Sequence, residues 1–295
     1  MKDHMTRELE GRYKSALNAA LQIGYQCLEK GHSALDAVEA AVIALEDDPL
    51  FNAGKGSVFA ANGLHEMDAS IMDGSSLNAG AISGVVGVKN PIRLARTIMQ
   101  HSEHVYLAGE GAMQYAREMN LEFVGNDYFY DEFRHQQWLE VKDTKKVQLD
   151  HSFSGDEKFG TVGAVALDQA GNVAAATSTG GMTNKMYGRV GDSAVVGAGT
   201  YANNATCAIS CTGNGEYFIR GVVAYDVSCL MEYGNKSLNE ACDIVVHERL
   251  PKIKGEGGLI GVDQNGNFCL AFNTPGMYRA VKTSAGHQDI SIYGN

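Results

Sequence analysis

Apolar residues recur every three or four positions between residues 7 and 30, and this spacing predicts an amphipathic helix that ends at Gly31. Ser33 is followed three residues later by Asp36, a pair that is typical of a capped helix start. We therefore expect a second helix to run through Leu45.

The chain then alternates between short apolar runs and stretches with helical spacing. We predict strands at 78–88 and 105–107, and helices at 91–100 and 111–119. The alternation stops between residues 125 and 158, where Trp138 lies among many charged residues, and this predicts a mobile connector. Elements of this kind and order indicate a layered α/β fold.

Two pairs of apolar runs in the second half are each separated by a short polar turn, which predicts two β-hairpins. Residues 169–172 form the first turn, between runs 162–168 and 173–177, and residues 263–267 repeat the pattern. The first hairpin brings the chain back on itself, so Thr179 is expected near Thr161. Between the hairpins we expect a strand at 206–211, a long helix over 216–233 and a helix that starts at Ser237 with Glu240 as its capping partner.

A single bond in front of the first hairpin carries the main candidate chemistry. Thr161 follows Gly160 at the mouth of a buried strand. A threonine hydroxyl is a weak nucleophile unless a base takes its proton, and a free α-amino group on the same residue is such a base. Cleavage before Thr161 would therefore create a self-activated nucleophile. The alternative is an ordinary β-branched residue that opens a strand.

Several polar residues downstream have the chemistry that amide hydrolysis needs. Thr212 and Gly213 are candidates for an oxyanion hole, because a hydroxyl and a backbone N–H can stabilise a tetrahedral intermediate. Arg189 suits a substrate carboxylate, and Asp192 suits a substrate ammonium. The alternatives are an Arg189–Asp192 ion pair on the surface and a plain turn between a strand and a helix at Thr212.

These segments, in this order, resemble the plant-type (type III) L-asparaginases and isoaspartyl peptidases, which are N-terminal nucleophile hydrolases. The resemblance is dense from the Gly160-Thr161-Val162-Gly163-Ala164-Val165-Ala166-Leu167-Asp168 run to Gly215. It extends over nearly the whole chain through weaker matches at 33–39, 49–56, 72–74, 104–111 and 272–279.

The resemblance implies a role for each matching residue. Thr161 would be the nucleophile, Gly160–Thr161 the cleaved bond and Thr179 the neighbour that tunes its proton. The oxyanion hole would be formed by Thr212 and Gly213. The residues implied at the substrate site are Arg189, Asp192, Gly191, Gly215 and Asn52. A structural sodium or potassium ion is implied at backbone carbonyls of Leu45, Phe51 and Ala53, and no cofactor is implied for catalysis.

The resemblance also implies the architecture: one domain over residues 1–295, built as a four-layer αββα sandwich. Cleavage would divide it into an α subunit, 1–160, and a β subunit, 161–295, and two such units would form a homodimer. Family members begin with a strand that ends in a His-Gly-Gly-Ala-Gly segment, whereas this sequence goes from Met1 into the first helix. We therefore expect the sheet to lack the family's first strand.

The expected function is hydrolysis of L-asparagine to aspartate and ammonia, together with hydrolysis of isoaspartyl dipeptides. Both substrates carry a free α-carboxylate and α-ammonium beside a β-carbonyl. One alternative is a glycosylasparaginase, which shares the nucleophile. Another is a catalytically silent scaffold, because the glycine-rich strand is missing.

The composition of the sequence limits which partners and which cellular compartment are expected. The net charge of −11 argues against nucleic-acid or anionic-membrane binding. The sequence has no run of 18 apolar residues and no signal-peptide core in its first thirty residues, which predicts a cytoplasmic protein without a membrane partner. Six cysteines without regular spacing fit free thiols in a reducing compartment. Asp68 and Asp73 are interpreted as structural.

Overall fold

The computed structural model describes residues 5–144, 147 and 160–294. Its first two helices lie where the apolar spacing predicts them. Helix α1 spans Arg7–Glu29, and the side chain of Thr6 caps it by accepting a hydrogen bond from the Leu9 amide. Helix α2 spans Ala34–Glu46 and starts with the predicted capping box of Ser33 and Asp36.

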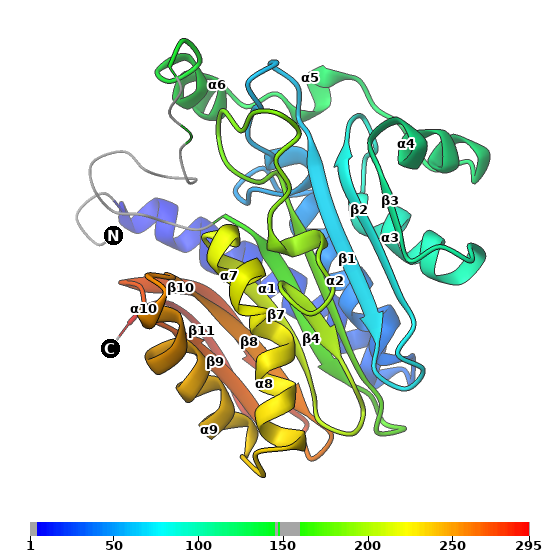
Figure 1. Cartoon of the computed structure of the whole chain (residues 1–295), viewed down its shortest axis with the longest axis vertical. Helices are drawn as coiled ribbons and strands as arrows, with labels where there is room; N and C mark the ends of the chain where they lie inside the picture. Colours follow the sequence, from blue (N-terminus) through cyan, green and yellow to red (C-terminus); the bar gives the residue numbers. More distant parts are fainter. Residues whose placement is uncertain (1–4, 145–146, 148–159, 295) are drawn as a thin grey trace.

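A five-stranded sheet forms the centre of the molecule, in the order β3-β2-β1-β5-β4 (Figure 1). Only the β2–β3 pair is parallel. The strands are β1 (Met67–Asp73), β2 (Ala79–Val85), β3 (Tyr106–Ala108), β4 (Val162–Leu167) and β5 (Val173–Thr179). The sequence pattern did not predict β1, which is buried on both faces along most of its length and therefore shows no alternation.

A second sheet has the order β6-β7-β8-β9 and is antiparallel throughout, and a separate hairpin pairs β10 with β11. The strands of the second sheet are β6 (Thr200–Ala202), β7 (Cys207–Gly213), β8 (Gly257–Asp263) and β9 (Phe268–Phe272). The hairpin consists of β10 (Gly276–Lys282) and β11 (Gln288–Tyr293). Both predicted turns are confirmed. In each turn, the carboxylate of an aspartate, Asp168 or Asp263, accepts hydrogen bonds from two backbone amides of the same turn.

Helices cover the outer faces of both sheets (Figure 1). α1, α2 and α3 (Pro91–His101) lie on the side of the five-stranded sheet, and α8 (Val223–Glu232) and α9 (Leu238–Asp243) lie against the four-stranded sheet. The remaining helical segments are α4 (Gly109–Glu118), α5 (Asn126–Phe129), α6 (Glu132–Leu139), α7 (Gly215–Gly221), α10 (Leu250–Lys252), the 3-10 turns η2 (Gly54–Gly56) and η3 (Asp192–Ala194), and the π-helical η4 (Ile244–Arg249).

Two predicted segments differ from the structure. The expected helix over 216–233 is broken at Val222, whose backbone is left-handed (φ 48°). The break lets the first amides of α8, at Ala224 and Tyr225, donate to the carbonyls of Ala198 and Gly197. The connector over 125–158 contains α5 and α6, and the Asp131 side chain caps the start of α6 by accepting a hydrogen bond from the Arg134 amide. The part of that prediction that covers 145–146 and 148–159 lies outside the described residues.

Side-chain alternation explains which residues meet between the two sheets. Strands β4 and β5 contact β7, and β4 also contacts β8. Along β5, Ala174 and Ala176 face the helices, whereas Val173 and Ala175 belong to a small apolar cluster that includes residues of both sheets. Most members of this cluster are small, so the two backbones approach closely.

A row of buried hydroxyl groups continues the same interface beyond the apolar cluster. Thr177 of β5 hydrogen-bonds to Ser210 of β7 (2.7 Å) and accepts from Thr200 of β6, while Ser70 of β1 donates to Thr200 (2.8 Å). The space between the sheets therefore changes from apolar to polar toward the end of β5, where Thr179 lies. Within the described ranges, no helix combines the length and the apolar character needed to cross a membrane.

Candidate active site

Thr161 and Thr179 are in contact where the two sheets end, and Thr212 faces the same interface from β7. Val162 pairs with Ser178, so Thr161 lies opposite Thr179, and the Thr161 hydroxyl donates to the Thr179 hydroxyl at 3.2 Å. On β7, Thr212 is two positions beyond Ser210, and alternate residues of a strand point to the same face. Thr212 therefore faces the same interface as Thr161. The short hairpin predicted from sequence brings Thr161 and Thr179 together as expected.

The turn that follows Thr179 holds this threonine from its other side. The Gly181 amide donates to the Thr179 hydroxyl at 2.9 Å. Asn52 is buried and joined to the same turn, because its side chain donates to the Gly181 carbonyl (2.7 Å) and its backbone carbonyl accepts from Gly180. Its remaining side-chain oxygen accepts from the Val58 amide. Asn52 thus fixes the turn that follows Thr179.

A small cavity of about 20 Å³ lies beside Thr161 and has room for about one water molecule. Most of the residues predicted for the site line it. The lining residues are Gly160, Thr161, Thr179, Gly181, Met182, Arg189, Gly191, Asp192, Ser193 and Gly213. Gly215 lies next to this group, since a Cβ atom placed on it would be 2.8 Å from Asp192 Oδ1 and 3.0 Å from Arg189 Nη2.

Three buried polar atoms in this region have no hydrogen-bond partner among the described residues. They are Asp192 Oδ2, Thr212 Oγ1 and Ser193 Oγ. Buried polar atoms are normally satisfied, because each unmet hydrogen bond costs about 1–3 kcal/mol. Of these three residues, Asp192 and Ser193 line the cavity beside Thr161, as expected for a site that is completed by a ligand.

Arg189 forms an ion pair, but its partner is not the one considered from sequence. Its Nε and Nη2 atoms each donate to a carboxylate oxygen of Glu216, both at 2.8 Å, so Glu216 rather than Asp192 accepts its hydrogen bonds. Burial by itself lowers the pKa of Arg189, but the hydrogen bonds to Glu216 and the surrounding carboxylates outweigh it, and the pKa is raised. Arg189 is therefore a fixed cation.

Burial dominates the electrostatics of Asp192 and raises its pKa to about 7, against the opposing effect of the Arg189 charge. Asp192 is 3% exposed and begins the turn η3. Its pKa thus falls near neutral pH. An ammonium group placed beside the unpartnered Oδ2 would favour the ionised carboxylate.

A family model described as Asparaginase matches residues 1–292 of the sequence. The chain belongs to the asparaginase family.

Curated members of the family are similar to this chain over most of its length. An isoaspartyl peptidase of Escherichia coli (strain K12) is 53% identical over 279 residues, which are 94% of this chain and 87% of the relative. A human isoaspartyl peptidase/L-asparaginase is 43% identical over 273 residues, 92% of this chain and 87% of the relative. A probable isoaspartyl peptidase/L-asparaginase 2 of Arabidopsis thaliana is 40% identical over 311 residues, with 98% and 95% covered.

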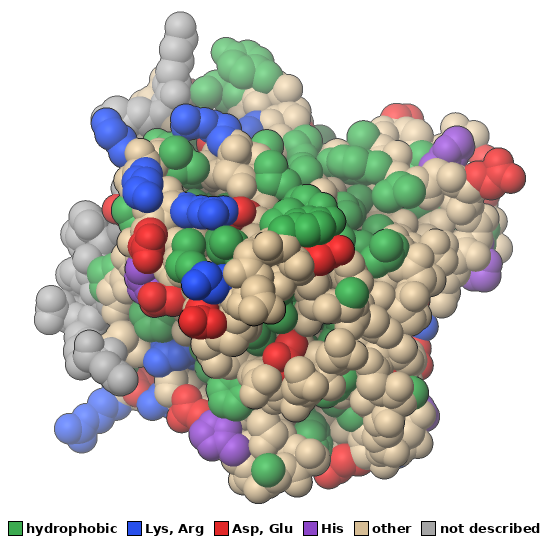
Figure 2. Space-filling view, turned by 60° about the horizontal axis from the view of Figure 1, so that its bottom comes forward, with side chains coloured by type: hydrophobic (Ala, Val, Ile, Leu, Met, Phe, Trp, Pro, Cys, Tyr) green, Lys and Arg blue, Asp and Glu red, His purple; other side chains and the backbone are tan. Residues whose placement is uncertain are grey.

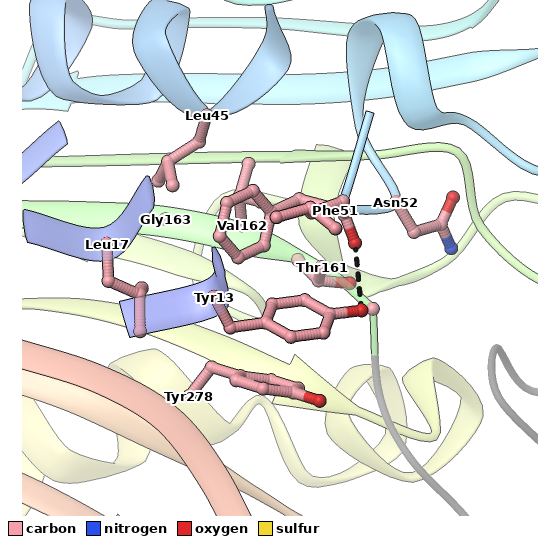
Figure 3. A pocket seen from close by; sticks show the side chains of 11 residues that line it. Tyr13, Leu17, Leu45, Phe51, Asn52, Thr161, Val162, Gly163 and Tyr278 are labelled. Atoms are coloured by element: carbon pink, nitrogen blue, oxygen red, sulfur yellow. Dashed lines mark hydrogen bonds between the residues drawn. The ribbon is translucent and has the colours of Figure 1, made fainter. Parts of the chain in front are cut away.

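This member of the asparaginase family has a second, larger cavity that Thr161 also lines, of about 70 Å³ (Figure 3). The rings of Tyr13 and Tyr278 stack at its edge, 4.5 Å between centroids, and the Tyr13 hydroxyl donates to the Leu50 carbonyl. Gly160 and Thr161 line both cavities. Sequence analysis did not anticipate this cavity, because helix α1 and strand β10 that bring the two tyrosines are far apart in the chain.

The loop after α2 carries the carbonyls predicted for an alkali cation. The carbonyl oxygens of Leu45, in the last turn of α2, and of Phe51 and Ala53, in the loop, each accept at least one backbone hydrogen bond. The loop is tightly wound, since a Cβ atom on Gly56 would be 2.0 Å from the Phe51 oxygen. Neutral oxygens in a compact loop are suitable ligands for a hard cation.

Two buried charged residues, Asp68 and Lys185, also contact the segments around this site, and the sequence analysis gave neither a role there. Asp68 of β1 is buried and accepts hydrogen bonds from the Gly84 and Gly191 amides, so it supports the segment that carries Arg189. Lys185 is buried and donates to the carbonyls of Glu66 and Gly180, next to the Thr179 turn. The structural interpretation of Asp68 fits these contacts.

Proposed function

We propose that this chain is a self-cleaving amidohydrolase that acts on L-asparagine and on isoaspartyl dipeptides. The observation that carries the proposal is the Thr161 hydroxyl, which directly follows Gly160, contacts Thr179 and faces a cavity lined by Arg189 and Asp192. Membership of the asparaginase family supports it, as do relatives named for isoaspartyl peptidase and L-asparaginase activity.

We propose the architecture that the resemblance implies: one N-terminal nucleophile hydrolase domain arranged as a four-layer αββα sandwich. The contacts of helices, sheet, sheet and helices in that order support it. Cleavage would convert it into chains 1–160 and 161–295. A homodimer of cleaved units and a cytoplasmic location complete the proposal.

Self-cleavage would start with attack of the Thr161 hydroxyl on the Gly160 carbonyl. The C–N bond breaks, an ester forms at the Thr161 oxygen, and water then hydrolyses the ester. The products are a carboxylate at Gly160 and a free amine on Thr161. Because Gly160 lines both cavities, its departure would also enlarge the space around the nucleophile.

In the hydrolytic reaction, the free amine of Thr161 would take the proton of its own hydroxyl as the oxygen attacks the substrate β-carbonyl. Thr212 and Gly213 would stabilise the oxyanion, where a single donor contributes about 2.7–4 kcal/mol. The α-carboxylate would bind Arg189, and the α-ammonium would bind Asp192. Ammonia or an amino acid leaves, and water releases aspartate from the enzyme.

We also propose that the loop carrying Leu45, Phe51 and Ala53 holds a sodium or potassium ion. The ion would rigidify the segment that contains Asn52, which is hydrogen-bonded to the turn after Thr179. No chemical step involves the ion.

The proposal is tested by intact mass and by activity. Scaling 31.6 kDa over 295 residues to 160 and 135 residues gives fragments of about 17 and 14 kDa. We expect both fragments, with Thr161 as the new N-terminus, and release of aspartate from asparagine and from an isoaspartyl dipeptide. Thr161→Ala should abolish both cleavage and hydrolysis, whereas Thr97→Ala, on the exposed face of α3, should change neither.

Arg189→Ala should lower kcat/KM for asparagine by about tenfold or more, because the α-carboxylate loses its charge-assisted hydrogen bonds. Unchanged turnover of asparagine by this variant would contradict the proposed substrate site. Preference for a glycosylated asparagine over an isoaspartyl dipeptide would identify a glycosylasparaginase instead. A protein that stays full-length and inert would support the scaffold alternative.

A further inference from the structure

The guanidinium group of Arg189 has two edges that can each bind a carboxylate through a pair of hydrogen bonds. Glu216 occupies the side edge, formed by Nε and Nη2, at 2.8 Å on both atoms. The Nη1 atom makes no hydrogen bond with any described residue. One edge of Arg189 is thus occupied by the protein, and the other retains free donors.

The glycines around Arg189 show that its position leaves no room for side chains. A Cβ atom on Gly191 would lie 2.9 Å from Nη1, and one on Gly215 would lie 3.0 Å from Nη2. The guanidinium group therefore lies between two bare backbone segments. These segments restrict where the group lies, and the Glu216 carboxylate fixes its orientation through two hydrogen bonds in one plane.

Glu216 and Arg189 differ in their access to solvent. The Arg189 side chain is 18% exposed, whereas that of Glu216 is 51% exposed and comes from the first turn of α7. Burial by itself raises the pKa of Glu216, but the hydrogen bonds from Arg189 outweigh it and lower the pKa, so the carboxylate stays ionised at neutral pH. Glu216 can therefore be substituted without emptying a core position.

We propose that Glu216 is a positioning residue for substrate recognition, which holds the side edge of Arg189 so that the Nη1–Nη2 edge receives the substrate α-carboxylate. This inference rests on the proposed function. It predicts selectivity for substrates with a free α-carboxylate, since a neutral α-carboxamide cannot accept a charge-assisted pair from that edge.

The position of Glu216 has a second consequence, for the charge on Asp192. The charged groups that act on Asp192 are Arg189, Glu216 and Asp68, and the thiol of Cys211 on β7 is a further titratable neighbour. The Glu216 charge raises the pKa of Asp192, and Arg189 lowers it. A neutral residue at 216 should therefore lower this pKa.

The test compares wild type, Glu216→Gln and Glu216→Asp, with Glu110→Gln as the matched control. Glu110 forms an exposed ion pair with Arg117 on α4 and lies outside the site. Glu216→Gln should raise KM for asparagine by about tenfold or more and leave kcat nearly unchanged. It should lose most of the discrimination against the α-carboxamide analogue of asparagine. The acid limb of its KM profile should move to lower pH.

Glu216→Asp separates charge from geometry, because it keeps the carboxylate but is one methylene shorter. We expect a raised KM with an acid limb close to that of wild type. Calorimetry with aspartate, which carries the same α-groups, should show weaker binding to both Glu216 variants, and Glu110→Gln should match wild type in every assay.

A lower KM in Glu216→Gln would overturn the inference, because it would mean that Glu216 competes with the substrate for Arg189. Equal losses on asparagine and on its α-carboxamide, or a loss confined to kcat, would overturn it as well. Wild-type protein that hydrolyses neither asparagine nor isoaspartyl dipeptides contradicts the proposed function instead, and aspartate calorimetry then still decides the role of Glu216.

Discussion

At the scale of single residues, the protonation of Asp192 should control substrate binding. Burial raises its pKa to about 7, so the carboxyl group is largely neutral below that pH and ionised above it. Only the ionised form attracts a substrate ammonium. KM for asparagine should therefore rise as the pH falls through about 7, and steady-state kinetics between pH 5.5 and 8.5 measures this.

The control for that prediction is Asp192→Asn, which cannot ionise. Its KM should be high at every pH and should lose the acid limb. A variant that keeps the wild-type dependence would show that another group, such as the Thr161 amine, produces the titration.

Residue contacts were predictable where the chain itself fixes them. Thr161 and Thr179 belong to one hairpin with a short turn, so their proximity follows from strand register. The ion pair between Arg189 and Glu216 was not predictable, because it depends on how a loop and a separate helix pack against each other. The sequence offers Asp192 as a nearer acidic residue, and only the fold shows that its carboxylate has no such bond.

At the scale of elements, the last residue of α2 links this helix to strand β5. Glu46 is completely buried, and its carboxyl group accepts hydrogen bonds from Ser178 of β5 (2.6 Å) and from the Ile92 amide (3.0 Å). Burial raises its pKa from the usual 4.5 to about 8. The folded state thus keeps a proton that the unfolded chain releases above pH 4.5.

The sign of the resulting pH dependence follows from that difference. Between about pH 4.5 and 8 the folded state binds more protons than the unfolded state, so the free energy of unfolding should fall as pH rises and level off above 8. Glu46→Gln should flatten this dependence. Urea unfolding at pH 5, 7 and 8.5 measures it, with Glu29→Gln on the exposed end of α1 as a control that keeps the wild-type trend. An unchanged slope in Glu46→Gln would contradict this assignment.

Elements were predictable where one face of a helix or one turn dominates the pattern. Helices α1 and α2 follow from apolar spacing and caps, and both hairpins follow from their aspartate turns. β1 was missed because Asp68 and Asp73 interrupt an apolar run that is buried on both faces. The break at Val222 was missed because a β-branched residue rarely adopts left-handed backbone, and the bonds to Gly197 and Ala198 that favour it are made through space.

At the scale of the whole molecule, the cleaved chains should remain one particle. β1 lies before the Gly160–Thr161 bond and pairs along its length with β5, which lies after it. Helix α2 also contacts both β4 and β5 across that boundary. After cleavage the two fragments should co-elute on size exclusion under native conditions and separate in denaturant. Separation without denaturant would contradict the packing.

On the face seen in Figure 2, acidic and basic side chains lie close together rather than in separate patches. The apolar pattern predicted a layered α/β fold, whereas the proposed four-layer order was implied by the family resemblance alone. Periodicity identifies which face of an element is buried, but it does not identify which other element covers that face.

The pairing of β1 with β5 should make refolding differ between the intact chain and a cleaved one. In the intact chain, the two strands pair as parts of one molecule, at a cost set by loop closure. If the chain is cleaved as proposed, the same pairing would join two molecules and would depend on their concentration. A denatured full-length chain would then refold alone, whereas the two denatured fragments would have to find each other again. On this proposal, the bond at Gly160 would tether the two halves during assembly, and its cleavage would make refolding a second-order reaction.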